Sequence, residues 1–229
     1  MIFMNEFLKN ELSGWKSWEI GWLLIATIGI TIITVALGED YLGLIAAVTG
    51  IICVILAGKG KLLTYFFAII HIITYALIAY NARYYGILML NVLYYLPMQF
   101  YGFYVWQKNM NPDTKEVYKK SLSRKNTAIL LVLVFVMTMA YGLILQVLNG
   151  NLPFVDALGT VVAVVGMYIS IKMYAEQWLL WIIVNIINLG LWIYAFLNGD
   201  GTVAISFMCI IYLANSVIMY FKWRNEAKS

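Results

Sequence analysis

Five side chains along residues 178–192 share one face of a predicted helix and suit the recognition of a small aromatic molecule. The segment reads WLLWIIVNIINLGLW and contains no charged residue. At about 100° per residue, the five positions fall within an arc of roughly 80°. They are Trp178, Trp181, Asn185, Asn188 and Trp192. Amides both donate and accept hydrogen bonds, and indole faces attract flat cationic rings. We therefore predict a binding site for a polar, cationic aromatic ligand.

A second polar group lies in the segment 91–106, which reads NVLYYLPMQFYGFYVW. Asn91, Tyr95 and Gln99 recur at every fourth position, so they share one helix face. Pro97 removes a helix hydrogen bond and is expected to kink this segment. The alternative for all these amides is a structural role, in which they bond to neighbouring helices. Tryptophans at the ends of membrane spans can also serve as interface anchors, and this alternative applies most to Trp178.

The composition places these segments in a membrane. The chain is 63% hydrophobic and 11% charged, whereas soluble domains carry about 25% charged residues. Uncharged apolar runs recur at close to the roughly 20 residues that span a bilayer as a helix. We predict an amphipathic segment within 1–16, followed by eight spans. The spans are 18–37, 41–57, 62–80, 84–106, 126–148, 153–172, 177–197 and 202–222.

The distribution of charge predicts the topology. If the N-terminus is cytoplasmic and eight spans follow, every Lys and Arg except Arg83 lies on the cytoplasmic side. Such sorting is what the positive-inside rule predicts. Both termini are therefore expected in the cytoplasm. The net charge of +4 is explained by these loops, and it does not indicate a nucleic-acid partner.

An internal repeat is indicated by the pattern LGxxxAVxG, which occurs at 42–50 and again, 116 residues later, at 158–166. At this offset Asn185 corresponds to Ile69, so the polar face belongs to one repeat only. One span separates the two triplets, which makes the repeats parallel and predicts a site between them near mid-membrane. The predicted divisions are an N-terminal segment and first span, a first repeat, a loop with a linker span, a second repeat and a tail. Their bounds are 1–40, 41–107, 108–152, 153–224 and 225–229.

The absence of charged residues from the middle of the predicted spans limits the possible transport mechanisms. No Asp, Glu, Lys or Arg lies in the middle of a predicted span, which favours passive uniport over coupling through intramembrane carboxylates. We find no phosphate-binding Gly-Lys-Ser/Thr loop, no nucleophile–base set and no metal-ligand cluster. Neither an enzyme nor a metal or other cofactor is expected. Cys53 and Cys209 suit buried apolar positions, and His71 suits a neutral, hydrogen-bonded packing position.

The WxxWxxxN pattern of Trp178, Trp181 and Asn185, with YxxMQxYGxYxW at 95–106, resembles the nicotinamide riboside transporter (PnuC) family of bacterial vitamin transporters. The resemblance extends from about residue 18 over nearly the whole chain. It implies an all-α membrane protein, with an N-terminal helix before a 3+1+3 core like that of SWEET transporters. It also implies a homotrimer in the bacterial plasma (inner) membrane. The family's substrate contacts correspond to Trp181 and Asn185, and more loosely to Trp178, Asn188 and Gln99.

The resemblance implies facilitated diffusion of nicotinamide riboside into the cell, where a kinase traps it for NAD biosynthesis. A phosphorylated product would meet no intramembrane Lys or Arg, and burying its charge unpaired is costly. Two alternatives remain open. Thiamine is also a cationic aromatic molecule, so a related transporter for thiamine, another vitamin or a nucleoside fits the motif. A non-transporting membrane scaffold or sensor would use the in-span amides for packing alone.

Overall fold

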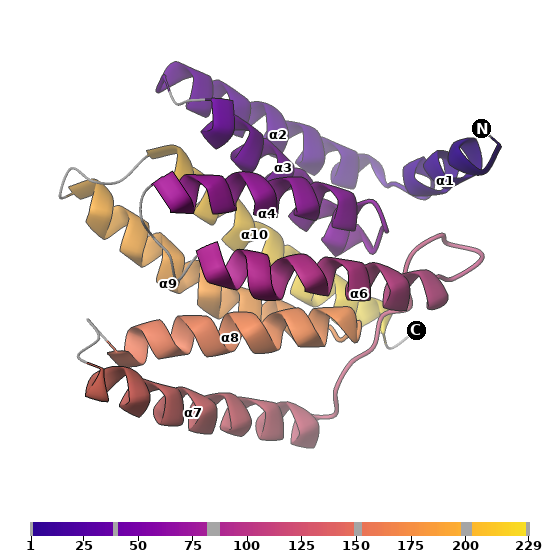
Figure 1. Cartoon of the computed structure of the whole chain (residues 1–229). Helices are drawn as coiled ribbons and strands as arrows, with labels where there is room; N and C mark the ends of the chain where they lie inside the picture. Colours follow the sequence, from indigo (N-terminus) through magenta and orange to yellow (C-terminus); the bar gives the residue numbers. More distant parts are fainter. Residues whose placement is uncertain (1, 39–40, 82–87, 149–152, 198–202, 228–229) are drawn as a thin grey trace. The chain divides into compact units, whose positions relative to one another are not determined.

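The computed structural model is all-helical in the residues it describes, which are 2–38, 41–81, 88–148, 153–197 and 203–227 (Figure 1). The chain divides into two units. Unit 1 comprises Met1–Tyr118 and Thr202–Tyr212, and unit 2 comprises Lys119–Gly201 and Leu213–Ser229. The last helix contributes its first part to unit 1 and the rest to unit 2.

The helix bounds follow the predicted spans closely. Unit 1 contains α1 (Ile2–Leu12), α2 (Ser17–Ala36), α3 (Tyr41–Lys59), α4 (Thr64–Asn81), the π-helix η1 (Leu90–Tyr95) and α6 (Leu96–Lys108). Unit 2 contains α7 (Arg124–Val147), α8 (Pro153–Ile171) and α9 (Gln177–Leu197), and the two units share α10 (Val203–Glu226).

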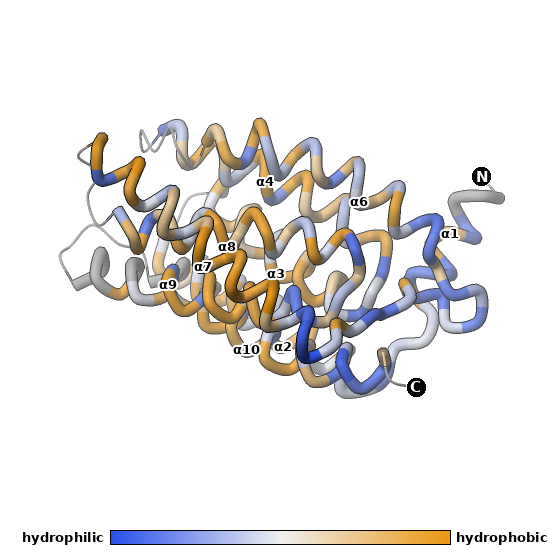
Figure 2. Tube along the Cα trace, turned by 90° about the horizontal axis from the view of Figure 1, so that it is seen from below, coloured by the Kyte–Doolittle hydropathy of each residue, from blue (hydrophilic) through white to orange (hydrophobic). Residues whose placement is uncertain are grey.

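Six helices in the described part of the chain are long and apolar enough to cross a bilayer. They are α2, α3, α4, α7, α8 and the Ser206–Glu226 part of α10. In α9 the described apolar stretch is Gln177–Gly190. Hydrophobic residues run along most of the long helices, whereas hydrophilic residues lie mainly at helix ends and in α1 (Figure 2). The prediction of a multi-pass, all-helical membrane protein is confirmed.

The span predicted at 84–106 differs from a simple kinked α-helix. Residues 82–87 lie outside the described residues, and the turn at Leu90–Tyr95 is a π-helix. The N–H of Leu96 bonds to the carbonyl of Asn91, five residues back. Pro97 follows at once and has no N–H to continue an α-helical ladder, so the chain changes its hydrogen-bond register before α6 begins.

The helix bounds give a second offset between the two repeats. Helix α8 begins and ends 112 residues after α3, and α9 begins 113 residues after α4. The sequence pattern gave an offset of 116, which differs by about one helical turn. On the structural offset, Asn185 corresponds to Ile72 rather than to Ile69. The counterpart is still apolar, so the difference in polarity between the repeats remains.

Close helix packing in unit 1 depends on a glycine. A Cβ added to Gly50 of α3 would collide with the Tyr212 hydroxyl and lie 2.8 Å from Nδ1 of His71. That imidazole bonds through Nδ1 to the carbonyl of Ala46 at 2.8 Å and stacks on Tyr75. The prediction that His71 is a hydrogen-bonded packing residue agrees with this position. The core beside it joins α2, α3 and α10 through Ala26, Ile30, Ala47, Ile51, Ile55 and Met208.

The polar segment after α6 is held by the turns that precede α4 and α9. In unit 1, Val117 donates its N–H to the Gly60 carbonyl at 2.9 Å, and Lys59 pairs with Glu116 at 2.8 Å. In unit 2, Lys120 donates its N–H to the Met173 carbonyl at 2.9 Å. The segment predicted to be the one long polar loop is therefore an ordered part of both units.

Candidate functional site

Helix α9 presents the predicted binding face unevenly, because neighbouring helices bury some of its members. Trp178 is buried and packs edge-on against Trp223 of α10, with ring centroids 5.8 Å apart. Trp181 is half-buried, and its indole lies over Gly166 of α8, where an added Cβ would be 3.7 Å away. Trp178 is therefore part of the packing of unit 2, whereas Trp181 retains an accessible ring.

Asn185 is the buried polar centre of this face. Its side chain is 6% exposed, and Nδ2 donates to the Ser216 hydroxyl of α10 at 3.1 Å. Among the residues that the structure describes, Oδ1 of Asn185 accepts no hydrogen bond. With Nδ2 bonded to Ser216, Oδ1 is the end of the Asn185 amide that can accept a hydrogen bond from a ligand.

Two residues of the predicted binding face are not shown to lie beside Asn185. Asn188 is exposed, although it lies only three residues after Asn185. The side chain of Trp192 lies outside the described residues. The helical periodicity predicted that all five residues share one face. In the structure Trp178 and Asn185 are buried, Trp181 is half-buried and Asn188 is exposed.

The second predicted cluster lies in unit 1, at the junction of the π-helix and α6. Asn91 is buried in η1, Tyr95 is half-buried at its last position, and Gln99 is 6% exposed in α6. Nε2 of Gln99 donates to the Tyr95 carbonyl at 3.1 Å. Like Asn185, Gln99 bonds to the protein through its amide nitrogen, and within the described part of the chain its oxygen accepts no bond. π-Helical turns are frequent at functional sites.

Ser216 is the residue that sequence reasoning missed. Serine is common in membrane helices and carries no motif of its own. A signal was nevertheless present, because Tyr95-Leu96 recurs 117 residues later as Tyr212-Leu213. The same offset places Ser216 in the position of Gln99.

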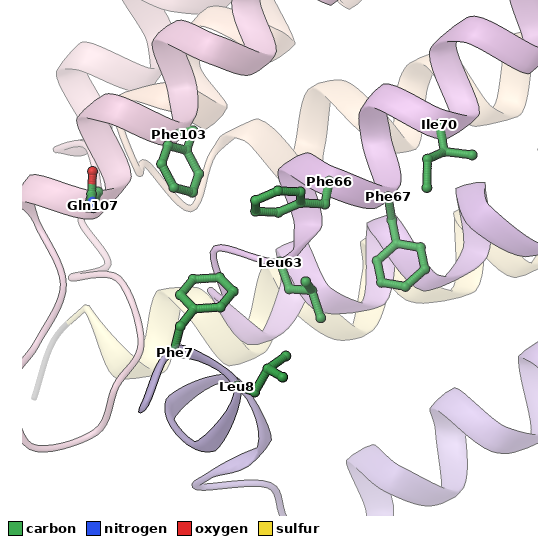
Figure 3. Close-up of a pocket in the computed structure, with 8 residues that line it drawn as sticks. All are labelled: Phe7, Leu8, Leu63, Phe66, Phe67, Ile70, Phe103 and Gln107. Carbon is green, nitrogen blue, oxygen red and sulfur yellow. The ribbon is translucent and has the colours of Figure 1, made fainter. Parts of the chain in front are cut away.

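An open cavity in unit 1 lies apart from these residues. It occupies about 370 Å³ and is lined by α1, the start of α4 and α6 (Figure 3). None of the eight predicted site residues lines it. Within the described residues, no group of three or more His, Cys, Asp or Glu side chains is placed to hold a metal ion.

Comparison with known proteins identifies the family. A sequence model of the nicotinamide mononucleotide transporter family matches residues 40–225. The nicotinamide riboside transporter PnuC of Neisseria mucosa is 39% identical over 227 residues, covering 96% of this chain and 86% of that protein. The Haemophilus influenzae protein of the same name is 36% identical over 224 residues, covering 96% of each chain.

A solved structure supports the same family. The crystal structure of the vitamin B3 transporter PnuC superposes with a TM-score of 0.86 and 37% sequence identity, and 97% of each chain is covered. The family of these proteins consists of transporters and not of enzymes. The resemblance inferred from the motifs is thereby confirmed: the chain belongs to the nicotinamide mononucleotide transporter family, together with the PnuC transporters.

Proposed function

We propose that the chain carries nicotinamide riboside across the membrane by facilitated diffusion. The observation that carries this proposal is the buried Asn185–Ser216 pair beside the half-buried ring of Trp181. A buried amide in a membrane helix is costly unless its bonding groups are used. Here the amide nitrogen is used by the protein, and the oxygen is left for a ligand.

The chemistry of the riboside fits these groups. Its pyridinium ring is a flat cation that can stack on the Trp181 indole. Its carboxamide NH₂ and ribose hydroxyls are donors for the acceptor oxygen of Asn185. A ligand that offered a carboxylate in place of the carboxamide would bring two negative oxygens toward an acceptor. We therefore assign Trp181 and Asn185 the main contacts. Gln99, Asn91 and Tyr95 form the second candidate cluster, within unit 1.

The riboside is favoured over its phosphate. The description of the matched family names the mononucleotide, whereas the relatives are named for the riboside. A phosphate dianion needs cationic partners, and the interiors of the predicted spans contain no Lys or Arg. At the helix ends, Lys59 pairs with Glu19 and Glu116, and Lys119 pairs with Glu226. We infer that phosphorylation in the cell traps the vitamin for NAD biosynthesis and makes uptake one-way.

The proposed architecture has eight spans, in which η1 and α6 together form the one interrupted span. One span precedes two parallel triplets, and α7 links them in a 3+1+3 arrangement. We place both termini in the cytoplasm of a bacterium and the chain in the inner membrane, because eight spans would put every Lys and Arg except Arg83 on the cytoplasmic side. A homotrimer, with one pathway per protomer, completes the proposal.

The test is transport by the purified protein in liposomes. Labelled nicotinamide riboside should equilibrate across the bilayer without an ion gradient, and nicotinamide mononucleotide should not enter. Strict dependence on sodium or protons would refute uniport. Stronger inhibition by unlabelled thiamine than by unlabelled riboside would assign the site to thiamine, and the absence of saturable flux would indicate a scaffold or sensor.

A further inference from the structure

The cavity in unit 1 is an apolar groove with one polar end. Seven of its eight lining residues are apolar, and Gln107 of α6 is the eighth (Figure 3). The apolar lining consists of Phe7, Leu8, Leu63, Phe66, Phe67, Ile70 and Phe103. Its volume of about 370 Å³ lies near the lower end of the range for small-molecule sites, roughly 300–1,000 Å³. A slim hydrocarbon chain matches this size and lining.

The groove is held open by fixed helices. Lys61, which is fully buried, donates to the Asn10 carbonyl at 2.9 Å, and the Leu63 N–H donates to the Glu11 carboxylate at 2.9 Å. These two bonds tie the end of α1 to the turn before α4. Burial, opposed by the Leu63 bond, raises the pKa of Glu11. The aromatic walls also touch, because Phe66 makes an edge contact with Phe103 at 5.9 Å.

The groove is continuous with an apolar face that is open to the surroundings. Phe66, Ile70, Ile73 and Leu77 are exposed and recur along one side of α4. An exposed apolar face on a helix long and apolar enough to cross a bilayer suits contact with lipid acyl chains. The first two of these residues also line the groove, so a lipid chain on this face of α4 has direct access to it.

Two lysines each follow a lining residue in the sequence. Lys9 follows Leu8, and Lys108 follows Gln107, and both lysines are exposed. The Lys108 ammonium lies over the Tyr104 ring, 4.1 Å from its centroid. Glu6 is also close in the chain, so the three groups together carry one net positive charge. This charge favours an anionic headgroup at the leaflet surface.

We propose that the groove binds one acyl chain of an anionic membrane phospholipid, whose headgroup phosphate lies beside Lys9 and Lys108. The lipid would fill the space between α1 and α4 and hold the amphipathic helix against the membrane-spanning part of unit 1. This site is separate from the proposed vitamin site and does not depend on the transported substrate.

The test is native mass spectrometry of the full-length protein released from micelles that contain phosphatidylglycerol or phosphatidylcholine with identical chains. The wild type should retain one phosphatidylglycerol per chain and much less phosphatidylcholine. Ile70→Trp fills the groove and should weaken phosphatidylglycerol retention about tenfold. Its matched control, Ile73→Trp, places the same side chain on the same exposed face outside the groove and should retain the lipid.

Headgroup recognition is tested by the double variant Lys9→Gln/Lys108→Gln, with Lys125→Gln as its control. The double variant should lose the preference for phosphatidylglycerol, while the control should keep it. Equal retention in the Ile70→Trp and Ile73→Trp variants would overturn the acyl-chain site. Equal retention of the two lipids by the wild type would overturn the anionic headgroup. A change in oligomeric mass with Ile70→Trp, at unchanged lipid retention, would assign the groove to a second copy of the chain.

Discussion

Units 1 and 2 use the same kind of packing but differ in their buried polar residues. In unit 1, Tyr65 of α4 packs edge-on against Trp106 of α6 at 5.2 Å, and in unit 2, Trp178 of α9 packs edge-on against Trp223 at 5.8 Å. Tyr65 and Trp178 are 113 residues apart, which is the structural offset between α4 and α9. About two helical turns beyond these aromatics, α4 buries Ile72 and α9 buries Asn185.

This difference separates residues that maintain the fold from residues that recognise a ligand. Both units contain an aromatic pair, and in both the polar segment after α6 bonds to a turn, before α4 in unit 1 and before α9 in unit 2. The Asn185–Ser216 pair occurs in unit 2, whereas the counterpart of Ser216 in unit 1 is Gln99, which bonds to the Tyr95 carbonyl at the end of η1. Substitutions in the shared set should alter stability, and substitutions in the polar set should alter affinity.

The largest expected effect is on stability and comes from Lys59→Met. Lys59 and Glu19 are 3% and 2% exposed and lie 2.6 Å apart, so the substitution leaves a buried carboxylate without this partner. We expect a loss of about 3–5 kcal/mol of unfolding free energy, measured by thermal unfolding in detergent. Lys119→Met is the control in unit 2, where Glu226 is 35% exposed and water can replace the lysine. Equal destabilisation by both variants would contradict the claim that burial of the carboxylate determines the loss of unfolding free energy.

Asn185→Leu should give the largest loss of affinity. It removes an acceptor to the substrate and leaves the Ser216 hydroxyl without this bond, so riboside binding should weaken about 10- to 100-fold. Isothermal titration calorimetry of the detergent-solubilised protein measures the riboside affinity. Ile72→Leu makes a volume-conserving change at the counterpart in unit 1 and should leave affinity nearly unchanged. A similar loss in both variants would remove the distinction between the units.

Trp181→Leu should weaken binding about tenfold, because stacking and cation–π contact are lost together. Trp181→Phe keeps an aromatic ring and should recover part of the affinity. The sharper measurement compares the cationic riboside with its reduced, uncharged form. Wild type should prefer the cation, and Trp181→Leu should reduce that preference. An unchanged ratio would show that the indole contributes packing alone.

Ser216→Ala should have the smallest effect, an increase in KM of about fivefold, since one hydrogen bond of about 1 kcal/mol is removed. The freed amide of Asn185 could then present either end to the ligand. We therefore expect weaker discrimination between the carboxamide riboside and its carboxylate analogue in transport competition. Loss of activity without a change in this discrimination would make Ser216 a packing residue.

The helices could be predicted from sequence because apolar length and turn residues are local properties. The bounds 41–57 and 153–172, for example, became α3 at Tyr41–Lys59 and α8 at Pro153–Ile171. The resemblance to the family was also available, since WxxWxxxN lies in one short stretch. The π-helix at Leu90–Tyr95 was not predicted, because it depends on how carbonyls and N–H groups pair before Pro97 rather than on hydropathy.

The site was predicted only in part, because periodicity gives a face but not what covers it. Asn185 and Trp181 kept roles compatible with binding, whereas Trp178 packs against Trp223 and Asn188 is exposed. Ser216 comes from another helix, and no pattern in residues 178–192 could indicate it. The offset between helix ends is about one turn shorter than the offset of the sequence pattern, because helix ends are set by turns.

The central claim is that Asn185, oriented by Ser216, recognises the riboside, and a double-mutant cycle tests it most directly. Riboside affinity is measured by titration for wild type, Asn185→Leu, Ser216→Ala and the double variant. If Ser216 acts through Asn185, the double variant should bind no more weakly than Asn185→Leu alone. Losses that simply add, or wild-type affinity in Asn185→Leu, would contradict the account.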